Sequence, residues 1–155
     1  MEINELNKIP GIDQNTKLFK AFSQFDDVLA ELKKKELPDD IIIAINNTVE
    51  GINSFKGPEK ALQKHIRKAQ SGMMKLIEKK LKIVPKNHYR NTWLVVGMSA
   101  FGIPIGIALG ASQGNTGMIG AGLPIGMVIG IALGTSLDKK AFKEGRQLNL
   151  ELKRY

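Results

Sequence analysis

The strongest constraint on this chain is a run of 47 consecutive residues, Asn91 to Leu137, that contains no Asp, Glu, Lys, Arg or His. All 38 Asp, Glu, Lys and Arg side chains of the 155-residue chain lie outside it. A soluble domain places charged residues among its apolar ones, because its surface faces water. The run therefore predicts a segment surrounded by lipid. The alternative is a hairpin buried in a soluble protein, for which only the other 108 residues would be left as cover.

A polar, turn-rich stretch at residues 112–116 divides this run into two apolar halves, residues 93–111 and residues 117–137. About 20 helical residues, each rising about 1.5 Å, cross a hydrocarbon core of roughly 30 Å. Each half is long enough to cross once. We therefore expect a transmembrane hairpin over residues 92–137.

Glycine recurs every four residues in both halves, and the second half repeats the first at an offset of 20 residues. Glycines four apart form a groove on one helix face, where another backbone can approach closely. The glycines expected to make packing contacts are Gly102, Gly106, Gly110, Gly122, Gly126, Gly130 and Gly134. Gly114 continues the same spacing. Two arrangements stay open: the two glycine ridges pack against each other within one hairpin, or at least one ridge packs against another copy and makes a homo-oligomer.

A β-hairpin is the competing geometry for the same run. Large residues fall on odd positions in both halves, which is also the two-residue period of a strand. Pro104 and Pro124 lie inside the two halves, and proline disturbs a strand more than a transmembrane helix. A barrel of such strands would have a lumen of glycine and alanine, unlike ordinary membrane barrels. We therefore expect helices.

The glycine hairpin is followed at residues 137–148 by Leu-Asp-Lys-Lys-Ala-Phe-Lys-Glu-Gly-Arg-Gln-Leu. Together they resemble the small bacterial glycine-zipper membrane protein family. The resemblance covers about residues 93–148. It implies an integral membrane protein with a two-helix glycine-zipper segment, and no settled biochemical activity. The location that we expect is the bacterial cytoplasmic (inner) membrane. Lipoprotein-type glycine-zipper proteins match less well, because they carry a lipidated cysteine and this chain has no cysteine.

The charged residues are distributed unevenly around the apolar run. The net charge is −4 over residues 1–55, +9 over residues 56–91 and +3 over residues 138–155. Because basic residues flank both outer ends and none lies in the central loop, the positive-inside rule places both termini in the cytoplasm. The residues expected at the surface of a bilayer with anionic headgroups are Lys75, Lys79, Lys82, Lys86, Tyr89, Arg90, Trp93, Lys139, Lys140 and Lys143.

Nucleic acid and the acidic part of the chain are two alternatives to the membrane surface as partners of the basic residues. Nucleic acid is not expected, because aromatic residues do not alternate with the basic ones as a base-stacking surface requires. Docking of the basic residues against the acidic residues 1–55, of the same chain or a neighbour, stays open.

The remaining sequence predicts an all-α protein. Apolar residues three and four apart over residues 1–91 predict a cytosolic three-helix amphipathic bundle, whose last helix is basic and leads to the membrane. For the first helix, Asp13, Asn15 and Thr16 are candidate N-caps. The third is expected to begin at Pro58 and to run to about Val84. Residues 138–155 are expected to form a short basic helical tail in the cytosol.

No group of residues in the sequence indicates catalysis, a cofactor or a metal ion, so we expect no enzyme. His65 lies among basic residues and His88 in the linker before the membrane, which disfavours a metal site. The adjacent carboxylates Asp26-Asp27 and Asp39-Asp40 diverge by about 100° on a helix.

The function expected from these features is non-enzymatic. We expect a membrane protein that self-associates through its glycine-zipper helices, as a pore-forming or membrane-perturbing effector controlled by its cytosolic helical domain. The alternative is a non-channel membrane anchor or scaffold that recruits a cytosolic partner protein.

Overall fold

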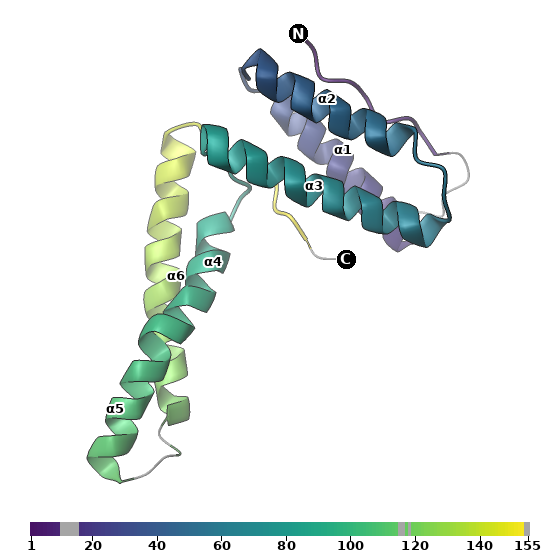
Figure 1. The fold of residues 1–155 in the computed structure, drawn as a ribbon. Coiled ribbons are helices and arrows are strands. Elements are labelled where there is room, and N and C mark those ends of the chain that lie inside the picture. The colour runs from purple at the N-terminus through teal and green to yellow at the C-terminus, as the bar shows by residue number, and fades with distance from the viewer. Residues whose placement is uncertain (10–15, 115–116, 118, 154–155) are drawn as a thin grey trace. The chain divides into compact units, whose positions relative to one another are not determined.

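The computed structural model describes residues 1–9, 16–114, 117 and 119–153 (Figure 1). These residues form helices and no β-strand. The prediction of an all-α fold is confirmed, and the strand geometry considered for the apolar run does not occur in its described residues.

Contacts within the chain divide it into two units. The helical unit comprises Met1–Val84 together with Leu148–Tyr155, and the hairpin unit comprises Pro85–Gln147. The boundaries predicted from the sequence lie after residues 91 and 137 instead. The second boundary differs because the last described residues of the chain pack on the helical unit and extend no separate tail.

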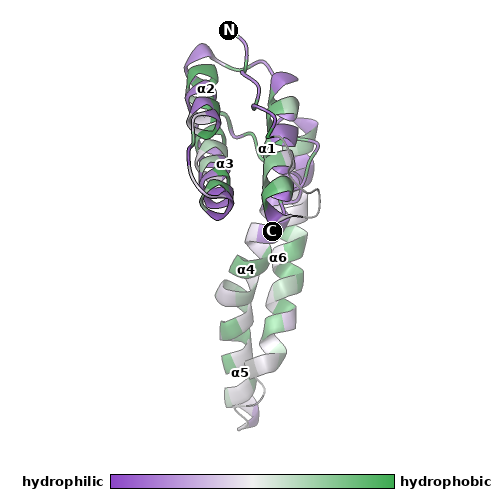
Figure 2. Ribbon diagram, turned by 90° about the vertical axis from the view of Figure 1, so that its right-hand side faces the viewer, coloured by the Kyte–Doolittle hydropathy of each residue, from purple (hydrophilic) through white to green (hydrophobic). Residues whose placement is uncertain are grey.

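The helical unit is built from three helices, α1 (Lys17–Lys33), α2 (Asp39–Asn53) and α3 (Glu59–Leu81). Helix α3 contacts both of the others. Each helix has an apolar face toward the shared core and a hydrophilic face outward, as Figure 2 shows. The largest completely buried side chains that the three helices contribute to this core are Phe25, Leu29, Leu32, Ile41, Ile45, Ile66 and Ile77.

Helix α1 begins where the sequence predicts, after a threonine cap. The Thr16 hydroxyl accepts a hydrogen bond from the Phe19 backbone N–H at 3.1 Å, which satisfies one of the unpaired donors of the first turn. The other two candidate caps, Asp13 and Asn15, lie outside the described residues.

Helix α3 is shorter than predicted. Pro58 precedes it as the N-cap, and the helix ends at Leu81 because Lys82 takes a left-handed conformation with φ of 57°. The predicted end at Val84 was therefore wrong by three residues. Ending the helix at Leu81 lets Ile83 and Val84 leave the helical path, and both are buried.

The predicted helical tail is also wrong for most of its length. The last helix of the hairpin unit continues to Lys143, and the residues from 146 to 153 are not helical. Leu148 is completely buried, and its N–H donates to the Val84 carbonyl at 2.9 Å. The backbone N–H groups of Asn149 and Lys153 donate to side chains of α1. The tail leaves the helical path because its apolar residues add to the core of the helical unit.

The hairpin unit consists of two antiparallel helical segments. Helix α4 (His88–Gly97), the π-helical turn η1 (Met98–Gly102) and helix α5 (Ile103–Gln113) form the first segment, and helix α6 (Ile119–Lys143) returns beside it (Figure 1). Both apolar halves of the sequence are thus helical where described, and each helical segment extends beyond the predicted half.

Candidate functional site: a glycine seam in an apolar hairpin

Glycines form most of the buried surface between the two helical segments of the hairpin. They occupy one face of α4, η1 and α5 and the facing side of α6. We call them the glycine seam; its members are Gly97, Gly102, Gly106, Gly110, Gly122, Gly126, Gly130 and Gly134.

The seam brings backbone against backbone. A Cβ atom added at Gly122 would lie 2.1 Å from the Gly102 carbonyl oxygen, and one added at Gly130 would lie 2.1 Å from the Trp93 carbonyl oxygen. At Gly134 it would lie 2.5 Å from the Arg90 Cα. Because these neighbours are backbone atoms, no rotamer change makes room. Any side chain at these positions must push the helices apart.

All seven glycines that the sequence analysis selected for helix packing lie in this seam, within one chain. Of the two arrangements left open by the sequence, the structure contains the packing of one ridge against the other. Every glycine of the seam is buried. At six of them, Gly97, Gly102, Gly122, Gly126, Gly130 and Gly134, an added Cβ would meet the backbone of the opposite helix.

The eighth member, Gly97, was missed because it breaks the four-residue spacing. It precedes Gly102 by five residues, and the π-helical turn between them accounts for the extra residue. In that turn the Ile103 N–H bonds the Met98 carbonyl, five residues back, so one turn holds an additional residue and returns Gly97 to the seam face.

Pro104 supplies a reason for a π turn at this point. Its ring has no N–H for a helical hydrogen bond and would collide with the carbonyl four residues earlier in a regular α-helix. A wider turn directly before the proline relieves that collision.

Gly114 does not belong to the seam, although it continues the four-residue spacing. It ends α5 in a left-handed conformation with φ of 62°, and its N–H bonds the Gly110 carbonyl. It is exposed, and nothing lies within 4 Å of a Cβ added there. Its role is to terminate the helix before the connection to α6.

Asp138 lies at the end of the seam and was not predicted as a structural residue. The residue is 7% exposed, and its carboxylate accepts hydrogen bonds from the backbone N–H groups of Tyr89 at 3.1 Å and Arg90 at 2.9 Å. These are donors of the first turn of α4, which have no partner inside the helix. A negative charge at a helix N-terminus is also favourable. Asp138 therefore caps α4 from α6. It joins the two helices at the end of the hairpin away from the connection between α5 and α6, which we call the open end.

Large apolar side chains lie on the outside of the hairpin. Only 22% of the most apolar window in each helical segment is buried. Figure 2 shows apolar residues along α4, α5 and α6. Among the described residues between Asn91 and Leu137, the exposed large apolar ones are Val95, Val96, Phe101, Ile103, Ile107, Ile125, Val128 and Leu133.

The predicted membrane-surface residues divide between the two units. Those of the hairpin unit lie at its open end, near the Asp138 cap: Lys86, Arg90, Lys139, Lys140 and Lys143 are exposed, and Tyr89 and Trp93 are half-buried. The other three, Lys75, Lys79 and Lys82, are exposed in the helical unit.

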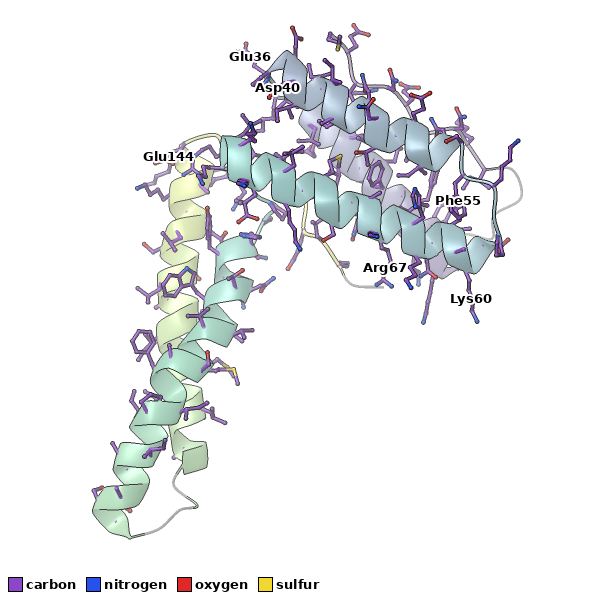
Figure 3. The ribbon with its side chains drawn as sticks, viewed as in Figure 1. Glu36, Asp40, Phe55, Lys60, Arg67 and Glu144 are labelled. Carbon is purple, nitrogen blue, oxygen red and sulfur yellow. The ribbon has the colours of Figure 1, made fainter. Side chains whose placement is uncertain are left out.

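The described residues contain no group of three or more His, Cys, Asp or Glu side chains placed to hold a metal ion. The His65 ring stacks on Phe55 with 4.9 Å between ring centroids. Figure 3 shows Phe55 beside α3, from which the basic side chains of Lys60 and Arg67 project outward. This part of the helical unit is explained by packing and by a solvated face.

Comparison with family models, curated proteins and solved structures found no match for the chain. The functional argument therefore stands on the geometry of the hairpin and of the helical unit.

Proposed function

We propose that this chain is an integral membrane protein whose glycine-packed hairpin anchors the helical unit to the bilayer. The observation that carries the proposal is the inverted arrangement of the hairpin, with glycines inside and large aliphatic side chains outside. In water such a hairpin would leave its apolar surface exposed and bury little of it. In lipid the outer face is solvated, and close backbone contact supplies the helix association that the hydrophobic effect cannot provide there.

Length and hydrogen bonding support the same proposal. The two apolar helices span 26 residues (His88–Gln113) and 24 residues (Gly120–Lys143), enough to cross a hydrocarbon core of roughly 30 Å. The polar side chain of Ser99 donates to carbonyls of its own helix, at 3.0 Å to Val95 and 3.1 Å to Val96. It therefore needs no water.

The charges at the hairpin ends support one orientation. Five exposed basic residues lie at the open end of the hairpin. The opposite end, where α5 is connected to α6, is called the closed end, and its described residues carry no charge. The positive-inside rule places the open end, and with it both termini, in the cytoplasm. The location in this proposal is the bacterial inner membrane.

Anchoring or scaffolding, with the helical unit as the partner-recruiting part, accounts for the hairpin better than a pore does. The seam glycines are already used within one chain. No ionisable side chain lies between Arg90 and Asp138, whereas a conducting path needs polar or charged groups or a hydrated backbone.

Self-association through the same glycines, with a pore or membrane perturbation as its result, is the competing proposal. Its support is the four-residue glycine spacing repeated in the sequence. It requires the seam to open, since a second copy and the opposite helix would occupy the same surface.

Topology is testable on a clean background, because the chain has no cysteine. We would place single cysteines by Ser112→Cys at the closed end and Lys86→Cys at the open end, then label intact cells with a membrane-impermeant maleimide. Labelling of residue 112 from outside and of residue 86 only after lysis supports the hairpin. Equal labelling of both before lysis, or full extraction of the protein by alkaline carbonate, contradicts it.

Oligomeric state separates the anchor from the self-associating protein. If the seam glycines pack only within one chain, light scattering of the purified full chain in detergent should give the mass of a monomer. A defined oligomer that is lost in Gly126→Leu but kept in Gly120→Leu would favour self-association. Gly120 is the matched control, because it lies on the same helix and nothing is within 4 Å of its added Cβ.

A further inference from the structure

Residues 1–9 lie extended beside α2, outside every helix of the chain (Figure 1). Ile3 and Leu6, three residues apart, are each 8% exposed and join the core cluster of the helical unit. The residues between and beside them are exposed. The segment thus contacts the helices as a peptide ligand does, through two apolar anchors.

An asparagine of α2 holds the backbone around the first anchor. The Asn46 side-chain carbonyl accepts from the Asn4 N–H at 2.8 Å, and its amide nitrogen donates to the Glu2 carbonyl at 2.9 Å. Both backbone groups flank Ile3. One amide side chain therefore satisfies a donor and an acceptor of an extended chain.

A second asparagine repeats this arrangement at the second anchor. The Asn53 side-chain carbonyl accepts from the Asn7 N–H at 2.8 Å, and its amide nitrogen donates to the Glu5 carbonyl at 3.1 Å. These groups flank Leu6. We call each asparagine with its two hydrogen bonds to the extended segment a clamp. The two clamps are equivalent, and each is centred on one of the two apolar anchors.

The spacing of the clamps fits an extended ligand. Asn46 and Asn53 are seven residues apart on α2, which at about 1.5 Å per residue is about 10.5 Å. Ile3 and Leu6 are three residues apart in an extended chain, which at about 3.1–3.4 Å per residue is about 9–10 Å. Two turns of helix therefore match three residues of peptide, and the clamps bind main-chain atoms whatever the side chains are.

Side-chain selectivity comes from the groove around the clamps. Lys33 of α1 pairs with Glu5 at 3.2 Å. A pocket of about 320 Å³ lies beside Ile3, and its lining includes Leu32, Leu37 and Ile42. The groove therefore favours apolar residues at two positions three apart, has room for a larger first anchor, and favours a carboxylate directly before the second anchor.

We propose that this groove along α2 is a recognition site for an extended segment of a partner protein with that pattern, and that residues 1–9 are its resident ligand in cis. The site goes beyond the membrane anchor, since it involves the helical unit alone. The cis segment competes at the effective concentration that a short linker gives, typically millimolar. A partner segment gains access when it binds more tightly or when the cis segment is released.

The test uses the full chain in detergent with its own segment released by Ile3→Asp and Leu6→Asp. The probe is a fluorescent synthetic peptide with the sequence of residues 1–9, followed by anisotropy. We expect saturable binding to the released chain and about tenfold weaker binding to the wild-type chain, because the cis segment competes. Adding Asn46→Ala and Asn53→Ala to the released chain should weaken binding about tenfold or more, since four hydrogen bonds are lost.

The matched control is a peptide that carries the same two aspartates in place of the anchors. Equal binding of the two peptides, or no binding to a released chain with unchanged helix content by circular dichroism, overturns the proposal.

A second measurement covers the case in which the released chain does not fold. A carbodiimide joins Lys33 to Glu5 as an amide in the wild-type chain, where the two side chains are paired. With excess ¹⁵N-labelled peptide we expect a labelled Glu5–Lys33 cross-link, which Lys33→Arg abolishes. Only the unlabelled cross-link at every peptide concentration would contradict exchange.

Discussion

The two units of this chain have opposite interiors. In the helical unit, Phe25, Ile45 and Ile66 are completely buried, and charged residues face outward. In the hairpin unit, glycines line the interface, while Ile107 and Val128 are 54% and 67% exposed. The same chain thus uses large side chains as filling in one unit and as an outer surface in the other.

The difference follows from the surroundings that each unit fits. In water, burial of apolar area drives helix packing, at roughly 25 cal/mol per Å², so large side chains belong inside. In lipid, apolar side chains gain nothing by leaving the solvent, and close contact of backbones becomes the main source of attraction. Glycine gives the closest contact. Removing a large buried side chain should therefore destabilise only the helical unit. Adding a large side chain at a seam glycine should destabilise only the hairpin unit.

The largest effect is expected from making a cavity in the helical unit. Phe25→Ala should lower its free energy of unfolding by about 3–5 kcal/mol, because Phe25 is completely buried. Hydrogen exchange of the full chain in detergent should show faster exchange in α1 and α3 and unchanged exchange in α5 and α6. Phe22→Ala is the control, since Phe22 is only partly buried and should cost less. Equal acceleration in both units would break the comparison.

The converse change is expected to disturb the hairpin unit alone. Gly126→Leu places a side chain where a Cβ would lie 2.4 Å from the Gly97 carbonyl oxygen and from the Gly102 nitrogen. Overpacking of this kind costs about 1–3 kcal/mol or more. The same exchange experiment should show faster exchange of the amides along the seam and an unchanged exchange rate in α2. Gly120→Leu, in open space on the same helix, should leave the seam unchanged.

A smaller effect is expected at the open end of the hairpin. Asp138→Ala removes both acceptors of the cap on α4, and loss of such a cap costs about 1–2 kcal/mol. Amides at the start of α4 should exchange faster, and those of α5 should not. Asp138→Asn keeps one acceptor and should have an intermediate effect. An unchanged exchange rate at Tyr89 and Arg90 in Asp138→Ala would contradict the capping role.

The smallest expected effect is a pH dependence in the helical unit. The Lys34 ammonium and the Asn149 N–H bond the Glu31 carboxylate and hold its pKa below the ordinary value. Because the folded-state pKa is the lower one, this stabilisation is complete above the unfolded pKa of about 4.5 and is lost as the pH falls through the folded value.

Docking of residues 148–153 reports on this pH dependence. Their amides should become less protected from exchange as the pH is lowered through that range, after correction for the intrinsic exchange rate. Glu31→Gln should remove most of this change while α6 behaves as in the wild type. The same pH dependence in Glu31→Gln would show that another group is responsible.

Local periodicity predicts most of the fold, because it reflects which face of a helix meets an apolar environment. Thr16, one of the three candidate caps, is the one that caps α1, and the seven glycines selected for helix packing are buried. The end of α3 could not be predicted. It depends on Lys82 taking a left-handed conformation, in which the Cβ of a lysine crowds the following carbonyl oxygen. Burial of Ile83 and Val84 accompanies this conformation.

Spacing alone also misassigned two glycines of the candidate site. Gly97 belongs to the seam and Gly114 does not, because a π turn before Pro104 shifts the register by one residue and because α5 ends at Gln113. Both facts depend on hydrogen bonds between residues five or four apart, which a count of glycine intervals does not contain.

The sequence by itself determined that this chain is helical and that one uncharged run of 47 residues forms an apolar hairpin, since composition and period act locally. Only the tertiary structure decided which residues meet across long separations. Asp138 caps a helix that begins 50 residues earlier, Asn46 and Asn53 hold an extended segment more than 40 residues away, and Leu148 returns to the core of the helical unit. These contacts depend on three-dimensional proximity, and no local pattern in the sequence records it.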